Sequence, residues 1–124
     1  MSLIVRAFPL IRSREEFDSF VATLAGERKH ETSQFYKHYG VTHESVHLQE
    51  TAPGQFYVIV VTKIDRPEEA AERYANASEG FHVWFKKQML HLSGIDPSSQ
   101  PLGPPTAQVF AWSDETRAGS NLCA

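Results

Sequence analysis

Apolar and polar residues alternate along the chain with two periods, one typical of strands and one of helices. Residues 3–10 are largely apolar and predict a first strand. Polar and apolar residues alternate from 41 to 50, whereas residues 55–64 are apolar on both faces. We expect these two segments to form a hairpin around the turn at 52–54, and residues 108–112 to form a last strand.

The remaining apolar residues recur at helical spacing. Ser13 and Glu16 form a capping box that predicts the start of a first helix, and Gly26 is expected to bend or interrupt it. A second helix is expected to begin at Pro67, which is favoured in a first helical turn. A third, with an aromatic face, is predicted at residues 79–93.

This order of elements predicts an α+β fold with the β-α-β-β-α-β plan of ferredoxin-like domains. The plan has a four-stranded antiparallel sheet with helices on one face, extended here by the extra helix at 79–93. We expect residues 1–112 to form one domain and residues 113–124 a polar tail. Because the strand at 55–64 is apolar on both faces, a second copy of the chain is the economical cover for the other face, which predicts a homodimer.

Composition excludes several classes of protein. The 124 residues suit a single domain, and a net charge of −3 gives no support for nucleic-acid binding. No apolar stretch approaches the roughly 20 residues of a membrane span. The short apolar run at 3–5 is typical of a strand, not of a signal peptide, so we expect a cytoplasmic protein. Cys123 is the single cysteine, which excludes an internal disulfide.

Three features resemble those of a known group of proteins: the Val5-Arg6-Ala7 triplet before a long first helix, the segment at 44–48 before a tight turn, and the apolar strand at 55–64. Over residues 3–112 the chain resembles the dimeric α+β barrel superfamily, and within it small bacterial proteins of unknown function. The resemblance implies a barrel built from two sheets. The superfamily includes cofactor-free monooxygenases, haem-degrading enzymes, isomerases and ligand-binding regulators, and fold alone does not choose among these activities.

A polar stripe on the second strand is the main candidate for chemistry. It consists of His43, Ser45, His47 and Gln49, which point to one side of an alternating segment. If that side is the barrel interior, His47 and His43 are candidate general bases, whereas Ser45 and Gln49 are candidate ligand contacts. Arg6 is expected to share this interior and to meet an anionic or oxygen-rich ligand. The alternative is an edge strand whose polar side is wet or meets the dimer partner.

Three aromatic positions complete the candidate list. His82 lies among aromatic residues and is a candidate general base or haem ligand, or else only the edge of a packed helix. Trp84 and Tyr57 are candidate ligand contacts, although aromatic residues at such spacings usually belong to a core.

Neither of two histidine patterns predicts a metal site. His43 and His47 are separated by about 13 Å along an extended strand, far more than bonds of about 2 Å to one metal ion allow. His30 begins a segment close to the H-E-x-x-H zinc motif, but Gln34 stands where the second histidine is required. We expect no metal and no cofactor.

These observations lead to two main hypotheses of function. In the first, the chain is a small-molecule-binding protein or a cofactor-free oxidative enzyme of the dimeric barrel type. Its ligand would be small, apolar or anionic, and would lie between the sheet and the partner. In the second, it is a non-catalytic structural or stress-related dimer whose polar stripe serves the interface. Haem binding through His82 or His47 is a third hypothesis.

Overall fold

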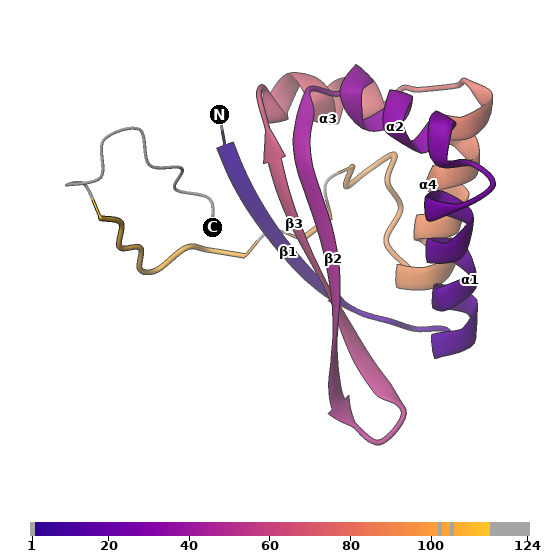
Figure 1. Ribbon diagram of the computed structural model, residues 1–124, viewed down its shortest axis with the longest axis vertical. Helices are drawn as coiled ribbons and strands as arrows, with labels where there is room; N and C mark the ends of the chain where they lie inside the picture. Colours follow the sequence, from indigo (N-terminus) through magenta and orange to yellow (C-terminus); the bar gives the residue numbers. More distant parts are fainter. Residues whose placement is uncertain (1, 102, 105, 115–124) are drawn as a thin grey trace.

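A computed structural model describes residues 2–101, 103, 104 and 106–114. The described chain is an α+β structure in which helices stack on one face of an antiparallel sheet (Figure 1). In chain order its elements are β1 (Ser2–Pro9), α1 (Arg14–Ala25), α2 (Lys29–His38), β2 (Val41–Ala52), β3 (Gln55–Ile64), α3 (Pro67–Ala75) and α4 (Gly80–Ser93). The hairpin between β2 and β3 is confirmed, and Gly54 supplies the positive φ of 76° that its turn requires.

The apolar strand β3 lies at the centre of the sheet, in the order β1-β3-β2. Arg6 of β1 and Val46 of β2 both stand opposite Val60 of β3. The even-numbered residues of β3 face the helices, and from Val58 to Ile64 they are all buried. The odd-numbered residues face the opposite side, which we call the open face.

The helix boundaries follow the local signals in the sequence. Ser13 and Glu16 form the predicted capping box at the start of α1. The interruption expected at Gly26 is also confirmed, because α1 ends at Ala25 and α2 begins at Lys29. Helix α4 ends at Ser93, and the next residue, Gly94, caps it with a φ of 74° that a residue with a side chain rarely adopts.

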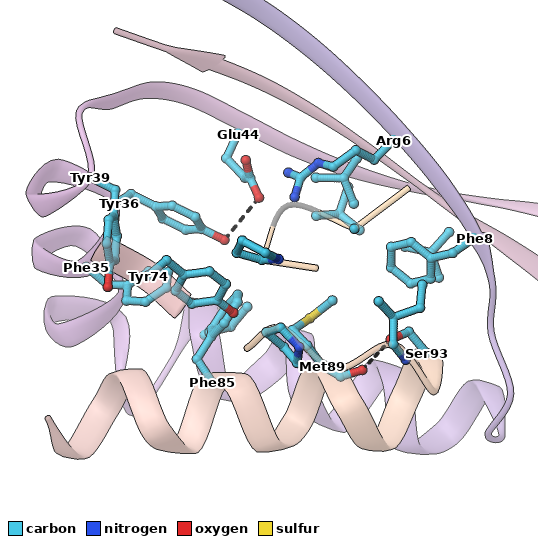
Figure 2. A pocket seen from close by; sticks show the side chains of 18 of the residues that line it. Arg6, Phe8, Phe35, Tyr36, Tyr39, Glu44, Tyr74, Phe85, Met89 and Ser93 are labelled. Carbon is cyan, nitrogen blue, oxygen red and sulfur yellow. Dashed lines mark hydrogen bonds between the residues drawn. The ribbon is translucent and has the colours of Figure 1, made fainter. Parts of the chain in front are cut away.

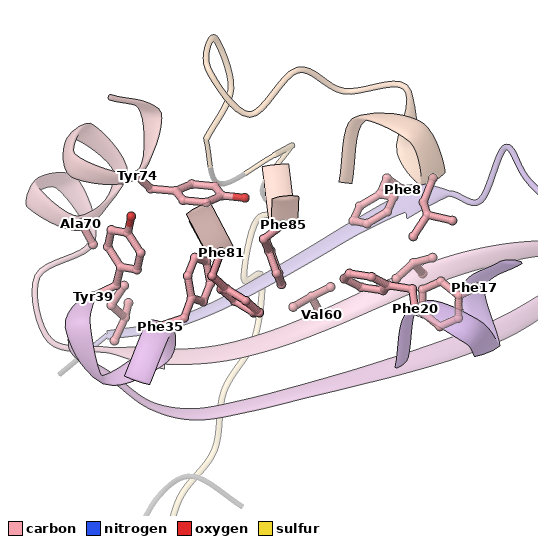
Figure 3. Packing of buried hydrophobic residues seen from close by; sticks show 13 residues of the cluster. Phe8, Phe17, Phe20, Phe35, Tyr39, Val60, Ala70, Tyr74, Phe81 and Phe85 are labelled. Atoms are coloured by element: carbon pink, nitrogen blue, oxygen red, sulfur yellow. The ribbon is translucent and has the colours of Figure 1, made fainter. Parts of the chain in front are cut away.

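Aromatic side chains form the core between the helices and the sheet (Figure 3). Phe35 on α2 lies at its centre, and its ring contacts Phe85 of α4 at a centroid distance of 4.6 Å and Phe81 at 5.3 Å. Trp84 packs at the edge, where the guanidinium of Arg28 lies 4.7 Å from its ring. The predicted apolar face of the helix at 79–93 is therefore confirmed as core.

The strand expected at residues 108–112 is absent from the described structure, where residues 106–114 contain no helix or strand. The carbonyl of Val5 accepts hydrogen bonds from the backbone amide and the hydroxyl of Thr106, and the chain then extends away from the body (Figure 1). The prediction rested on local β propensity, which does not supply a partner strand. The described sheet therefore has three strands, and not the four of the ferredoxin-like plan. Of the expected tail at 113–124, residues 115–124 lie outside the described residues.

Candidate binding cavity

A cavity lies between the helices and the helix-facing side of the sheet (Figure 2). It leaves about 130 Å³ for the centres of water-sized molecules, whereas about 10–15 Å³ suffices for a single water. Most of its wall is apolar and includes Phe8, Phe20, Phe35, Val58, Phe85 and Met89. This volume is below the roughly 300–1,000 Å³ of sites for drug-sized ligands and close to the about 150 Å³ of an apolar cavity that binds benzene, so the cavity suits a molecule of about one aromatic ring.

The proline-rich connection after α4 forms one side of this cavity. Pro97, Gln100 and Pro101 all line it, and Pro97 is buried. The carbonyl of Asp96 accepts backbone hydrogen bonds from Ser99 and Gln100, which hold the connection in a turn. Because proline fixes its own backbone angle, this segment of the wall has few conformations available to it.

Arg6, Glu44 and Tyr36 line the cavity and are joined by hydrogen bonds through Thr62, which does not itself line it. Arg6 Nη2 donates to Thr62 Oγ1 at 2.7 Å, and this hydroxyl donates to Glu44 Oε1 at 2.6 Å. Tyr36 on α2 donates its hydroxyl to the other carboxylate oxygen of Glu44 at 3.3 Å (Figure 2). The register explains the arrangement, because Glu44 stands directly opposite Thr62, whereas Arg6 stands opposite Val60, two residues along β3 and on the same face.

Burial controls the protonation of this polar wall. The pKa of Glu44 is raised above its ordinary value chiefly because burial disfavours the carboxylate, while the hydrogen bond from Thr62 and the charge of Arg6 act in the opposite direction. Burial also raises the pKa of Tyr36 and of Tyr74, a further lining residue from α3. The two phenols are therefore neutral at physiological pH, and Glu44 keeps its proton to a higher pH than an exposed carboxyl does.

The polar stripe of β2 lies on the open face, away from this cavity. His43, Ser45, His47 and Gln49 stand opposite the odd-numbered residues of β3. The predicted common direction of the four residues is thus confirmed. His47 Nε2 lies 3.0 Å from Ser45 Oγ, so two of the candidates contact each other. Tyr57 lies on the same open face and is 43% exposed.

Arg6 does not share that face, contrary to the sequence prediction. It stands opposite Val60, whereas His47 stands opposite Ile59, and neighbouring residues of a strand point to opposite sides. The prediction was wrong because an alternating pattern within one strand does not fix its register against another strand. The structure instead brings Arg6 together with Glu44.

Sequence reasoning missed Tyr36, Glu44 and Tyr74, which line the cavity, and Thr62, which links Arg6 to Glu44. Glu44 carried the strongest signal. It alternates with Val46 and Leu48 on the side of β2 expected to face the helices, and a charged residue on an apolar face needs a partner. Tyr36 and Tyr74 sit in apolar stripes, where a phenol is indistinguishable from a core aromatic.

His82 is a buried core residue with 9% of its surface exposed. Its Nδ1 lies 2.7 Å from the hydroxyl of Tyr39 and its Nε2 lies 3.5 Å from a carboxylate oxygen of Glu79. Burial lowers the pKa of His82, which favours the neutral ring, with Nε2–H facing Glu79 and Nδ1 accepting from Tyr39. Both ring nitrogens thus face protein groups, which gives His82 a structural place in the fold.

Changing Tyr39 to phenylalanine is expected to lower the free energy of unfolding by about 1–3 kcal/mol, because a buried nitrogen of His82 loses its partner. Urea unfolding at neutral pH measures this change. Tyr57→Phe is the matched control, since its phenol lies on the open face, and a change within about 0.5 kcal/mol is expected there. Equal effects of the two substitutions would contradict the structural assignment of His82.

No protein-family model, curated protein or solved structure matches the chain. Within the described part of the chain, no group of three or more histidine, cysteine or acidic residues is arranged to hold a metal ion. None of the described helices has both the length and the apolar character needed to span a membrane. The candidate function therefore rests on the cavity itself.

Proposed function

We propose that the protein binds a small, mainly apolar molecule carrying one neutral oxygen group in the cavity between its helices and its sheet. The observation that carries this proposal is that Arg6, Glu44 and Tyr36, joined by hydrogen bonds through Thr62, converge on the wall of a mainly apolar cavity. An apolar pocket with a few convergent polar groups is the usual form of a small-molecule site. The ligand is thus placed on the helix side of the sheet, and not between the sheet and a partner.

The paired charges favour a neutral ligand over an anionic one. Arg6 attracts an anion, but the carboxylate of Glu44 lies on the same wall and repels it. A phenol or alcohol avoids this conflict, because its hydroxyl is able to donate to Glu44 and to accept from Arg6. Of the two ligand types expected from the sequence, the site therefore fits the apolar type better, provided that the molecule carries such a hydroxyl.

The raised pKa of Glu44 favours catalysis without a cofactor as a second candidate function. A buried carboxylate beside an apolar cavity is suited to take a proton from a bound molecule and to return it at another atom. Arg6 and Tyr36 would then stabilise the charge that develops on the oxygen of that molecule. This is the acid–base form of the cofactor-free enzyme suggested by the resemblance to dimeric barrels.

The polar stripe on the open face supports the alternative, a non-catalytic structural or stress-related dimer. His47, His43 and their neighbours lie outside the cavity, where a second sheet would cover them in a dimeric barrel. In that case the cavity binds no ligand, and the function depends on the dimer alone. A cytoplasmic location is part of both proposals.

Binding is tested with three fluorinated probes of equal ring size, observed by ¹⁹F NMR: fluorobenzene, 4-fluorophenol and 4-fluorobenzoate. We expect 4-fluorophenol to bind about tenfold more tightly than either of the other probes, since one hydrogen bond to a charged group contributes about 1.5–3 kcal/mol. Glu44→Gln is expected to remove most of this preference.

Two further variants separate the cavity from the open face. Val46 lines the cavity, so Val46→Phe narrows it and is expected to abolish binding of all three probes. His47 lies on the same strand but on the open face, and His47→Ala is expected to leave binding unchanged. Loss of binding in His47→Ala with retention in Val46→Phe would refute the helix-side cavity, and absence of binding by any probe to the wild type would favour the structural dimer.

A further inference from the structure

The segment from Thr106 to Asp114, here called the arm, exposes its large apolar side chains. Val109, Phe110 and Trp112 are 93%, 81% and 77% exposed, well above the other large apolar residues of the described chain. The arm leaves the body on the side of the sheet opposite the helices (Figure 1). No charged residue occurs between 106 and 113. An uncharged, extended aromatic segment of this kind is prone to pair with another chain.

The open face of the sheet offers a matching apolar surface. Val5 and Ala7 of β1 lie beside Val61 and Ile59 of β3 on this face, and all four side chains are only partly covered. β1 is an edge strand of the described sheet, so no other described strand pairs with its outer edge. Among the backbone hydrogen bonds of the described residues, the bond from Thr106 to Val5 is the single one made to this edge from outside the sheet.

We propose that the arm of one copy packs on the open face of a second copy, whose own arm returns the contact, so that the protein is an arm-exchanged homodimer. The arm touches its own sheet at Thr106 and then diverges from it on the side opposite the helices (Figure 1), and its Phe110 and Trp112 are largely exposed. A two-fold axis makes such an exchange reciprocal, so both arms and both open faces are covered at once.

The apolar area of the arms is sufficient for a stable dimer. An aromatic side chain buries about 150–250 Å², so the four aromatic residues of two arms bury on the order of 600–1,000 Å². The sheet surface beneath them brings the total to the range of about 1,200–2,000 Å² that is typical of specific interfaces. The lack of positive charge on the arm excludes an electrostatic partner such as a nucleic acid and favours a surface as apolar as the open face.

Sedimentation equilibrium of the full chain, from low micromolar concentration upward, tests this proposal. The wild type is expected to be a dimer, and the double variant Phe110→Ser/Trp112→Ser is expected to raise the dimer dissociation constant roughly 100-fold or more. The matched control is Ile11→Ser/Leu90→Ser, which removes two apolar residues that are 52% and 45% exposed outside the arm. We expect this control to dimerise like the wild type.

A mixing experiment distinguishes exchange from pairing of the arm with its own β1. Each chain carries Cys123→Ser together with one new cysteine, either Gln108→Cys on the arm or Val61→Cys on the open face. A short thiol cross-linker is expected to join the two kinds of chain in the mixture. A separate chain that carries both new cysteines reports pairing within one chain. A monomeric wild type, an unchanged dimer in the arm double variant, or cross-linking within that separate chain but not between the two kinds of chain in the mixture would each overturn the proposal. The monomeric arm variant is expected to bind 4-fluorophenol as the wild type does. A failure of the dimer proposal is therefore distinguishable from a failure of the cavity proposal.

Discussion

Replacing Phe35 with alanine is expected to lower the free energy of unfolding by about 3–5 kcal/mol. Phe35 is 5% exposed and stands where α2 meets α3, α4 and the sheet. Its ring contacts those of Tyr36, Tyr39, Tyr74, Phe81, His82 and Phe85. Alanine removes these contacts and leaves a void that the surrounding rings fill only in part. Because the free energy of unfolding of a domain is only about 5–15 kcal/mol, this single change removes a large part of it.

Chemical denaturation followed by circular dichroism measures the effect of Phe35→Ala. Phe35→Leu keeps part of the volume and is expected to fall between the wild type and alanine. Leu90→Ala provides the control, since Leu90 lies on α4 with 45% of its surface exposed, and a change within about 0.5 kcal/mol is expected. A loss below about 1 kcal/mol for Phe35→Ala would show that this ring is not the centre of the core.

The local elements of the fold were predictable because their signals lie within a few residues of one another. A capping box needs only Ser13 and Glu16, and a helix interruption needs only Gly26. The central place of β3 follows from apolar residues on both of its faces. These features depend on spacing along the chain, which the sequence displays directly.

The candidate site was less predictable, because it depends on register between strands. Arg6, Glu44 and Thr62 come from three different strands, and a slip of one residue in any of them would move its side chain to the open face. The residues at 108–112 illustrate the same limit. Their composition favours a strand, but whether they pair with β1 depends on where the proline-rich connection delivers them.

Replacing Arg6 with methionine is expected to destabilise the protein by about 2–3 kcal/mol at neutral pH. The guanidinium of Arg6 donates to Thr62, and its positive charge lowers the pKa of the buried carboxyl of Glu44. Methionine preserves much of the side-chain volume but leaves Glu44 in an apolar wall without that charge. Urea unfolding of Arg6→Met over a range of pH values measures both the loss and its cause.

The pH dependence of this loss identifies Glu44 as its origin. The pKa of Glu44 in the folded protein is already above its ordinary value of 4.5, and removal of Arg6 raises it further. A folded-state pKa raised in this way means that the stability contributed by Glu44 is fully present below pH 4.5 and is lost as the pH rises through the folded-state pKa. The destabilisation of Arg6→Met should therefore be small in acid and should grow toward neutral pH.

A double-mutant cycle completes the test. In Arg6→Met/Glu44→Gln the carboxyl at position 44 is absent, so the double variant is expected to be more stable at neutral pH than Arg6→Met alone. Its defect is also expected not to grow with pH. Arg6→Lys is the conservative control, because it retains the charge and is expected to keep most of the wild-type pH profile. A defect in Arg6→Met that is equal at all pH values, and that Glu44→Gln does not relieve, would mean that Arg6 acts through packing alone. The polar wall would then lose the electrostatic coupling on which its preference for a neutral ligand depends.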